Sequence, residues 1–323
     1  MSAVGGGIEA LVAGVLAGET RAVARMMSAA ESGFAEGRAA MAEIYRHAGK
    51  AQVIGLTGVP GSGKSTLVGA LTKAFRKTGR KVGIVAVDPS SPFSGGAILG
   101  DRVRMADLAT DDGVFIRSLA TRGSLGGLAR ASLDTADILD AAGFDLVLVE
   151  TVGVGQDEVD IASAAHTVIV VSAPGLGDDV QAIKAGVLEI ADIHVVSKAD
   201  RDDANRTAAD LKAMLNLGLT GRDRGDWKVP VIRTSAESGE GVEELMHAID
   251  AHGEHLKTSG ELEVRQRLIT EMRVLKTAED IVRARIEAER ESGLKEVLDA
   301  TAGRQTDPQA AARELLRHLK IDG

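Results

Sequence analysis

The sequence predicts an α/β protein with a doubly wound, mainly parallel sheet and helical segments at both ends. In the middle of the chain, short β-rich runs alternate with helical segments, as in a parallel sheet with crossover helices. These runs are almost continuously apolar, which is typical of strands buried on both faces. Five of the six prolines lie between residues 60 and 230. We therefore expect an N-terminal helical arm at 1–50, a sheet domain at 51–255 and a C-terminal helical extension at 256–323.

Composition and charge narrow the range of functions. With 323 residues, 44% hydrophobic and 26% charged, the chain is typical of a soluble globular protein. Its net charge of −9 and its pI near 5.4 argue against a nucleic-acid-binding surface. The absence of cysteine excludes disulfides, thiolate metal sites and cysteine nucleophiles, and it fits a reducing compartment.

The two ends of the chain are expected to be helical. Both have apolar residues at helical spacing, and Gly260, Gly293 and Gly303 are plausible breaks in the C-terminal part. Near the N-terminus, Glu9 and Glu19 bracket an apolar run that is too short to span a bilayer, and no basic residue precedes it. We therefore expect a cytoplasmic protein with no membrane partner. The apolar positions of these helices are Leu11, Val15, Val23, Met26, Met27, Leu268, Met272, Leu275, Ile281, Val282 and Ile286.

Six apolar runs are predicted to be strands of the central sheet. Ligands of doubly wound sheets bind beyond the carboxyl ends of the strands. The polar residues that follow each run are therefore the candidates for function. The runs are VIGLTG from Val53, VGIVAVD from Val82, DLVLVE from Asp145, TVIVVS from Thr167, DIHVVS from Asp192 and VPVIRTS from Val229.

A phosphate-binding loop follows the first predicted strand. The sequence GVPGSGKST, residues 58–66, has the pattern G-x-x-x-x-G-K-S between a strand and a helix. Its glycines let backbone N–H groups turn toward phosphate oxygens, and the following helix N-terminus favours the same anion. Lys64 is expected to reach the β- and γ-phosphates, and Ser65 to bind Mg²⁺. The alternative is an ordinary Gly-rich turn. The predicted nucleotide-binding residues are Gly58, Val59, Pro60, Gly61, Ser62, Gly63, Lys64, Ser65 and Thr66.

Two carboxylates end the second and third predicted strands beside this loop. Asp88 and Glu150 stand where a carboxylate usually holds Mg²⁺, directly or through water. Glu150 opens the pattern Glu-x-x-Gly, where many GTPases have Asp-x-x-Gly, so the amide of Gly153 could contact a γ-phosphate. The alternative is that both carboxylates only cap loops.

Several loops and side chains have two interpretations. Asp101 lies in the long polar segment 88–105 and is a candidate metal ligand or water-positioning acid, or else an ordinary turn residue. The Gly-rich segment 121–127 could line the site or form a turn. The histidines of the segment 247–255 are interpreted as a solvated helix end and not as a metal site; they are His247, His252 and His255.

The sequence SKAD, residues 197–200, predicts recognition of guanine. The two oxygens of Asp200 can accept hydrogen bonds from N1–H and the amino group of guanine, whereas adenine would leave this carboxylate unpaired. Lys198 is expected to lay its aliphatic stem along the base. Ser197 replaces the usual Asn and is shorter, a loss of roughly 0.5–1.5 kcal/mol. The loop TSAESGEG follows the last strand and resembles the loop that contacts guanine O6, which adds Ser235, Ala236 and Glu237.

Together these motifs resemble the MeaB-type GTPases of the SIMIBI class, which are also labelled ArgK or LAO/AO transport ATPases. The resemblance extends over nearly the whole chain. It implies a P-loop GTPase core with an N-terminal helical arm and a C-terminal extension used for homodimerisation. The segments that carry it are GVPGSGKST, VAVDPSSPFSGGAILGDRVRM, TRGSLGG, LVLVETVGVGQDE and GDDVQAIKAGVLEIAD.

The resemblance also implies an activity and a partner. Such proteins hydrolyse GTP to GDP and phosphate with Mg²⁺, and they are chaperones that gate cofactor loading of adenosylcobalamin-dependent methylmalonyl-CoA mutase and limit its inactivation. Lys184 is a catalytic candidate on the resemblance alone, and Gln156 is left unassigned because its spacing differs from that of small GTPases. This chain is expected to bind GTP or GDP but no cobalamin, and the mutase must be supplied in trans. The expected catalytic residues are Lys64, Asp101, Glu150 and Lys184, and the expected metal ligands are Ser65, Asp88, Asp101 and Glu150.

Three alternative functions remain open. The partner could be an isobutyryl-CoA or 2-hydroxyisobutyryl-CoA mutase. A nickel-insertion GTPase of related fold would need a His- or Cys-rich segment, and the sequence has none. An ATP-dependent transporter component would need a membrane partner surface and a base loop without Asp200.

Overall fold

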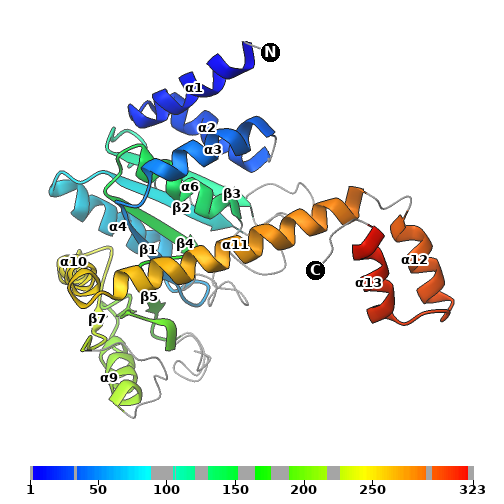
Figure 1. Ribbon diagram of the computed structural model, residues 1–323. Coiled ribbons are helices and arrows are strands. Elements are labelled where there is room, and N and C mark those ends of the chain that lie inside the picture. Colours follow the sequence, from blue (N-terminus) through cyan, green and yellow to red (C-terminus); the bar gives the residue numbers. More distant parts are fainter. Residues whose placement is uncertain are drawn as a thin grey trace. The chain divides into compact units, whose positions relative to one another are not determined.

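The core of the protein is a sheet of seven parallel strands, which confirms the predicted fold class. The strand order is β3-β2-β4-β1-β5-β6-β7, so the first strand lies in the middle and later strands extend the sheet on both sides (Figure 1). This is the arrangement of a doubly wound sheet. The strands are β1 (Gln52–Thr57), β2 (Val82–Asp88), β3 (Val114–Ala120), β4 (Leu146–Thr151), β5 (Thr167–Ser172), β6 (Ile193–Val196) and β7 (Val231–Arg233).

The chain consists of two compact units, the sheet unit (Met1–Ile269) and the C-terminal unit (Thr270–Gly323). Within the part that the structure describes, none of the helices combines the length and apolar character needed to cross a membrane. The computed structural model describes residues 3–32, 35–88, 105, 107–120, 130–151, 164–175, 189–216, 226–288 and 293–318.

The sequence patterns predict six of these strands and miss β3. This strand lies at the edge of the sheet, and its residues from Val114 to Ser118 are only half-buried. Its run of apolar residues is interrupted by Arg117, whose Nε donates a hydrogen bond to Glu31 at 2.9 Å. A charged side chain in a short run is evidence against a buried strand. Here the N-terminal helices supply the partner for that charge, and the sequence pattern does not reveal it.

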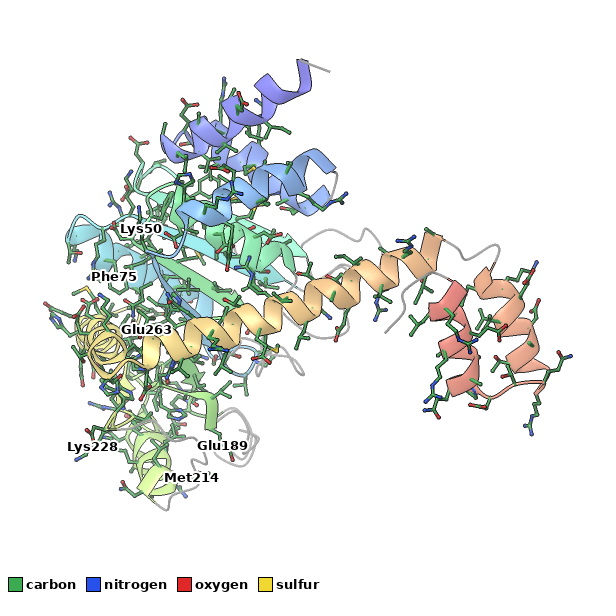
Figure 2. The ribbon with its side chains drawn as sticks, in the orientation of Figure 1. Lys50, Phe75, Glu189, Met214, Lys228 and Glu263 are labelled. Carbon is green, nitrogen blue, oxygen red and sulfur yellow. The ribbon has the colours of Figure 1, made fainter. Side chains whose placement is uncertain are left out.

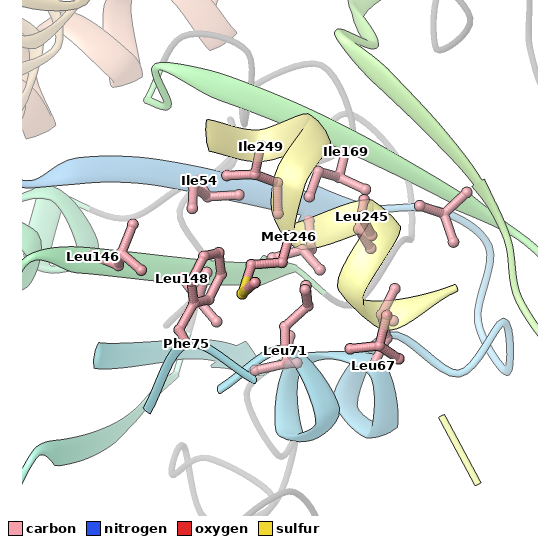
Figure 3. Packing of buried hydrophobic residues seen from close by; sticks show 14 of the residues in the cluster. Ile54, Leu67, Leu71, Phe75, Leu146, Leu148, Ile169, Leu245, Met246 and Ile249 are labelled. Atoms are coloured by element: carbon pink, nitrogen blue, oxygen red, sulfur yellow. The ribbon is translucent and has the colours of Figure 1, made fainter. Parts of the chain in front are cut away.

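Helices cover both faces of the sheet, as expected for strands that are apolar on both sides. Alternate residues of β2 illustrate the division, because Ile84 packs with α4 and α10 whereas Val85 packs with α6 and the N-terminal helices. Figure 3 shows Phe75 of α4 and Met246 of α10 packed against Leu148 of β4. The helices of the sheet unit are α1 (Ala3–Leu16), α2 (Thr20–Ser32), α3 (Ala35–His47), α4 (Lys64–Lys77), α6 (Arg130–Ala141), α9 (Ala204–Asn216) and α10 (Val242–Ser259).

The C-terminal part is helical, with boundaries at the three predicted glycines. Helix α10 ends at Gly260, and α11 (Glu261–Ala288) begins with the next residue. In the C-terminal unit, α12 (Gly293–Ala302) ends just before Gly303 and packs against α13 (Pro308–His318). The first turns of α11 belong to the sheet unit. The predicted domain boundary at 256 stays a prediction.

A buried ion pair attaches the beginning of α11 to the sheet. Arg265 of α11 donates from its two Nη atoms to the two carboxylate oxygens of Asp192, each at 2.7 Å, and also to the carbonyl of His166 at 2.8 Å. Burial alone would raise the pKa of Asp192, but the hydrogen bonds from Arg265 and the neighbouring charges hold it below its ordinary value. Burial lowers the pKa of His166 to about 4. Asp192 is therefore ionised opposite the guanidinium of Arg265, and both side chains have little contact with water.

Replacing Arg265 by methionine is expected to lower the free energy of unfolding by about 3–5 kcal/mol, because it leaves the buried charge of Asp192 without its partner. Urea unfolding at neutral pH measures this change, and Arg267→Met, at an exposed position of the same helix, is the control. The folded-state pKa of Asp192 is depressed, so its contribution is present above the ordinary carboxylate pKa and is lost as the pH falls. The difference between variant and wild type should therefore shrink in acid. Equal stability at neutral pH would show that the pair contributes nothing.

Candidate functional site

The phosphate-binding loop begins with a glycine that no other residue can replace. Gly58 follows β1 with φ +137°, and a Cβ at this position would lie 2.0 Å from the carbonyl oxygen of Val171 on β5. This close approach of two backbones lets the chain leave the sheet and turn into the loop. The loop ends at Gly63, which precedes the first residue of α4 and also has a positive φ, +86°. The predicted strand–loop–helix context is therefore confirmed.

Lys64 is the first residue of α4, and its buried side chain reaches back to this loop. Its Nζ donates hydrogen bonds to the carbonyls of Gly58, at 2.8 Å, and Val59, at 3.1 Å. The loop thus holds a positive charge directly at the N-terminus of α4, a helix of 14 residues. An ammonium group, the positive end of a helix dipole and inward-turning amides all favour a polyphosphate at this place.

Ser65 and Glu150 meet beside the phosphate loop. The Ser65 hydroxyl donates to Oε1 of Glu150 at 2.7 Å, and Glu150 is only 5% exposed at the end of β4. A hydroxyl and a carboxylate are the hard oxygen ligands that Mg²⁺ prefers, so this pair fits the predicted metal site. Bound there, Mg²⁺ would neutralise charge on a phosphate chain. Asp88 ends β2, the strand next to β4, but its side chain lies outside the described part of the structure. Other predicted residues outside the described part are Asp101, Gly153 and Lys184.

The predicted base loop is attached to the phosphate loop by two side chains. Ser197 follows β6 and is 5% exposed, and its hydroxyl contacts the carbonyls of Ser62 in the phosphate loop and, at 3.0 Å, of Ser172. Lys198 has φ +55°, and its Nζ donates to the carbonyl of Gly61 at 2.9 Å. These contacts join residues that are far apart in sequence, and they hold the two halves of the site together.

Asp200 lies next to the loop after β7, as the guanine interpretation requires. A hydrogen bond from the Ser235 side chain lowers the pKa of Asp200, and its own backbone N–H and the charges of Arg201 and Lys198 lower it further. Its carboxylate is therefore ionised at neutral pH, and the residue is exposed and accessible to a ligand. The backbone amide of Ala199 also donates a hydrogen bond to the backbone carbonyl of Thr234 at 3.0 Å. Ala236 and Glu237 lie in the turn that follows Ser235.

Sequence reasoning missed Ser172 and misinterpreted one histidine. Ser172 ends β5, and its carbonyl accepts hydrogen bonds from both the amide and the hydroxyl of Ser197. Its place at the end of a predicted strand was the available signal. His252 was expected at a solvated helix end, but it is fully buried, with its ring 4.8 Å from that of Trp227. Among the described residues, no group of three or more His, Asp or Glu side chains could hold a metal ion.

Ser197→Ala is expected to weaken GTP and GDP binding together, by about two- to tenfold, because a neutral hydrogen bond between the two loops is lost. The preference for guanine over adenine should stay, since Asp200 and Ser235 are unchanged. Calorimetric titration with GTP, GDP and ATP measures both effects, and Ser197→Thr, which keeps a hydroxyl, is the control. Wild-type affinity in Ser197→Ala would mean that this contact has no effect on nucleotide binding.

Comparison with known proteins places the chain in a family. The sequence model of the family described as "Methylmalonyl Co-A mutase-associated GTPase MeaB" matches residues 21–291. The chain belongs to the MeaB family. It is therefore a GTPase by family, in agreement with the phosphate loop and the base loop described above.

Individual relatives of this MeaB-family GTPase resemble it over most of its length. A protein of Pyrococcus horikoshii that is named as a GTPase is 46% identical over 312 residues, 97% of this chain and 98% of that protein. A mouse protein named as the mitochondrial homolog of methylmalonic aciduria type A is 39% identical over 213 residues, 65% of this chain and 51% of its own length. A crystal structure described as a LAO/AO transport system kinase has a TM-score of 0.70 and 28% identity, and the match covers 97% of both chains.

Proposed function

We propose that this MeaB-family GTPase uses GTP binding and hydrolysis to gate cofactor loading of an adenosylcobalamin-dependent acyl-CoA mutase and to protect or reactivate that enzyme. Methylmalonyl-CoA mutase is the proposed partner, because the description of the family names it. The observation that carries the nucleotide part is the attachment of the base loop to the phosphate loop, through Ser197 and Lys198. A bound nucleotide would span both loops, so its state can be sensed across the whole site.

We propose the following roles for the residues of the site. Lys64 neutralises phosphate charge, and Ser65 and Glu150 hold Mg²⁺ together with Asp88 and Asp101. Gly153 contacts the γ-phosphate, and Lys184 assists hydrolysis. The base is held by Ser197, Lys198, Asp200, Ser235, Ala236 and Glu237. The Ser65–Glu150 pair supports the metal assignment, because it brings two hard oxygen donors together beside the phosphate loop.

The protein is further proposed to form a homodimer through α11. Large apolar side chains on one face of this helix, whose side chains are drawn in Figure 2, are unusually exposed, with exposed fractions of 51% for Leu268, 45% for Met272 and 57% for Leu275. Burying such a side chain contributes about 1.5–3 kcal/mol, so a second chain that covers this stripe would be favoured.

Met272→Glu combined with Leu275→Glu is expected to convert the dimer to monomers, because two charges would be buried in an apolar interface. Light scattering measures the mass in solution, and Ile281→Glu, which adds a charge at an exposed position on the opposite face of the same helix, is the control. If the double variant is still a dimer, the interface does not lie on this face of α11.

A binding experiment with purified proteins tests the proposed function. The full chain is immobilised and exposed to methylmalonyl-CoA mutase in the presence of GDP, a non-hydrolysable GTP analogue or no nucleotide. We expect a complex whose stability depends on the nucleotide, with isobutyryl-CoA mutase and 2-hydroxyisobutyryl-CoA mutase tested in parallel as alternative partners. Binding to none of these mutases in any nucleotide state would contradict the chaperone function.

A further inference from the structure

A groove on the outer face of α4 runs away from the nucleotide site. It has a volume of about 890 Å³ and lies between α4 on one side and α10 with the preceding turn on the other. One end is lined by Ser65 and Thr66 of the phosphate loop and by Ala236 and Glu237 of the predicted base site. The groove is therefore continuous with both halves of the nucleotide site. It lies wholly within the sheet unit.

The walls of this groove carry opposite charges. The α4 wall presents Lys77 and Lys73, which pairs with Asp107, another lining residue, whereas the opposite wall presents Glu237 and Glu243. The two lysines and the two glutamates are exposed, and the ion pair of Lys73 with Asp107 lies on the surface, where such pairs are weak. A partner with acidic groups on one side and basic groups on the other would complement both walls. The floor between the walls is apolar or small: Gly69, Ala70, Ala74, Val242 and Met246.

Gly69 has no role that the described part of this chain explains. It lies in the interior of α4, where glycine is among the least favourable residues. A Cβ built on it would meet nothing within 4 Å among the described residues, so no neighbouring element requires its small size. A glycine in a helix interior is otherwise useful where another backbone approaches closely. The space beside Gly69 is therefore open among the described residues and would admit the backbone of a bound segment.

We propose that this groove is the docking surface for an amphipathic helix of the partner mutase. The proposal rests on the proposed function, which supplies the partner. Two packed helices leave a groove in which a third helix can lie, and a small-residue floor lets it approach closely. The docked helix places carboxylates toward Lys77 and basic side chains toward Glu243. It would contact residues at 65–66 and 236–237, and mutase binding would then change the rate of nucleotide release.

The test uses full-length variants and purified methylmalonyl-CoA mutase. Gly69→Leu fills the groove, Ala74→Glu adds a charge to its floor, and Gly69→Ala is a mild variant whose added methyl meets nothing in the described chain. We expect each isolated variant to fold and to keep its basal GTP hydrolysis, and the two Gly69 variants to melt at or above the wild-type temperature, because glycine is unfavourable inside a helix. Mutase affinity should fall at least about tenfold for Gly69→Leu and Ala74→Glu, as for substitutions at the centre of an interface. Lys212→Leu, on exposed α9 and outside the groove, is the matched control.

The outcomes separate this proposal from the proposed function. Docking in the groove is supported if the groove variants are folded but no longer bind the mutase and no longer release GDP in response to it. The control variant must bind the mutase like the wild type. Unchanged binding by Gly69→Leu and Ala74→Glu overturns the docking site while the proposed function stands. If these variants are monomers where the wild type is a homodimer, and they still bind the mutase, the groove is occupied by a second copy of this chain. This result would overturn the proposal. If the wild type itself binds no mutase, both proposals fail together.

Discussion

Lys64→Ala is expected to reduce GTP hydrolysis to the background of the assay, a loss of at least about a hundred- to a thousandfold in kcat. Lys64 is buried in the phosphate loop and supplies the positive charge there, held by the carbonyls of Gly58 and Val59. Without it, only Mg²⁺ and backbone dipoles would remain to stabilise the charge that develops on the transferred phosphoryl group. Release of inorganic phosphate from GTP in the presence of Mg²⁺ measures the effect.

The control for this prediction is Lys212→Ala, which removes a positive charge from the exposed face of α9. Thermal unfolding should show that both variants are folded, because removing a side chain from the loop leaves the sheet and its covering helices intact. If Lys64→Ala releases phosphate at the wild-type rate, the proposed role of the phosphate loop in hydrolysis is wrong. This conclusion does not depend on the proposed mutase partner.

Asp200→Asn is expected to weaken GTP binding by about ten- to a hundredfold, since it removes a charge-assisted acceptor for the two adjacent donors of guanine. ATP binding should not improve, because adenine has no pair of donors at these positions and the asparagine amide adds no complementary contact. Xanthosine triphosphate should bind the variant better than it binds the wild type, because xanthine carries an oxygen where guanine carries the amino group. Calorimetric titration of each nucleotide gives the three affinities.

The pH dependence of this contact follows from the pKa of Asp200. The hydrogen bond from Ser235 holds that pKa below its ordinary value, so the carboxylate stays charged across the neutral range. The preference for GTP over ATP should therefore be constant around neutral pH and decrease only in acid, when the carboxylate is protonated. A wild-type protein that prefers ATP would show the guanine assignment to be wrong, and an Asp200→Asn variant with full GTP affinity would place the base elsewhere.

Much of the fold could be predicted from local patterns. The runs at β1, β2, β4, β5, β6 and β7 are apolar on both faces, and helix boundaries lie at Gly260, Gly293 and Gly303, of which Gly260 has a φ of +78° that favours glycine. β3 could not be predicted in this way, because the charge of Arg117 is accommodated only by Glu31, which is distant in the sequence. An edge strand of this kind depends on which helix covers it.

Some features of the candidate site could likewise be predicted from local sequence, and others could not. The phosphate-loop motif identifies Lys64 and Ser65 because their spacing is local and the loop needs a fixed strand–loop–helix context. Glu150 and Asp200 could be proposed from their places after strands, but their partners could not. The sequence contains no indication that Ser197 would contact the carbonyl of Ser62, or that Ser172 would accept two hydrogen bonds from Ser197.

By itself, the sequence determined the class of the sheet, the phosphate loop and the family resemblance, and it predicted the base loop with its acidic residue, because all of these depend on residue type and on spacing within short segments. The tertiary structure alone decided that Arg265 pairs with Asp192, that His252 is buried beside Trp227, and that a groove with opposite charges opens beside Gly69. These features join residues from separate helices and strands. Their energies come from burial and from the exclusion of water, and burial is established only when the layers of the fold pack together.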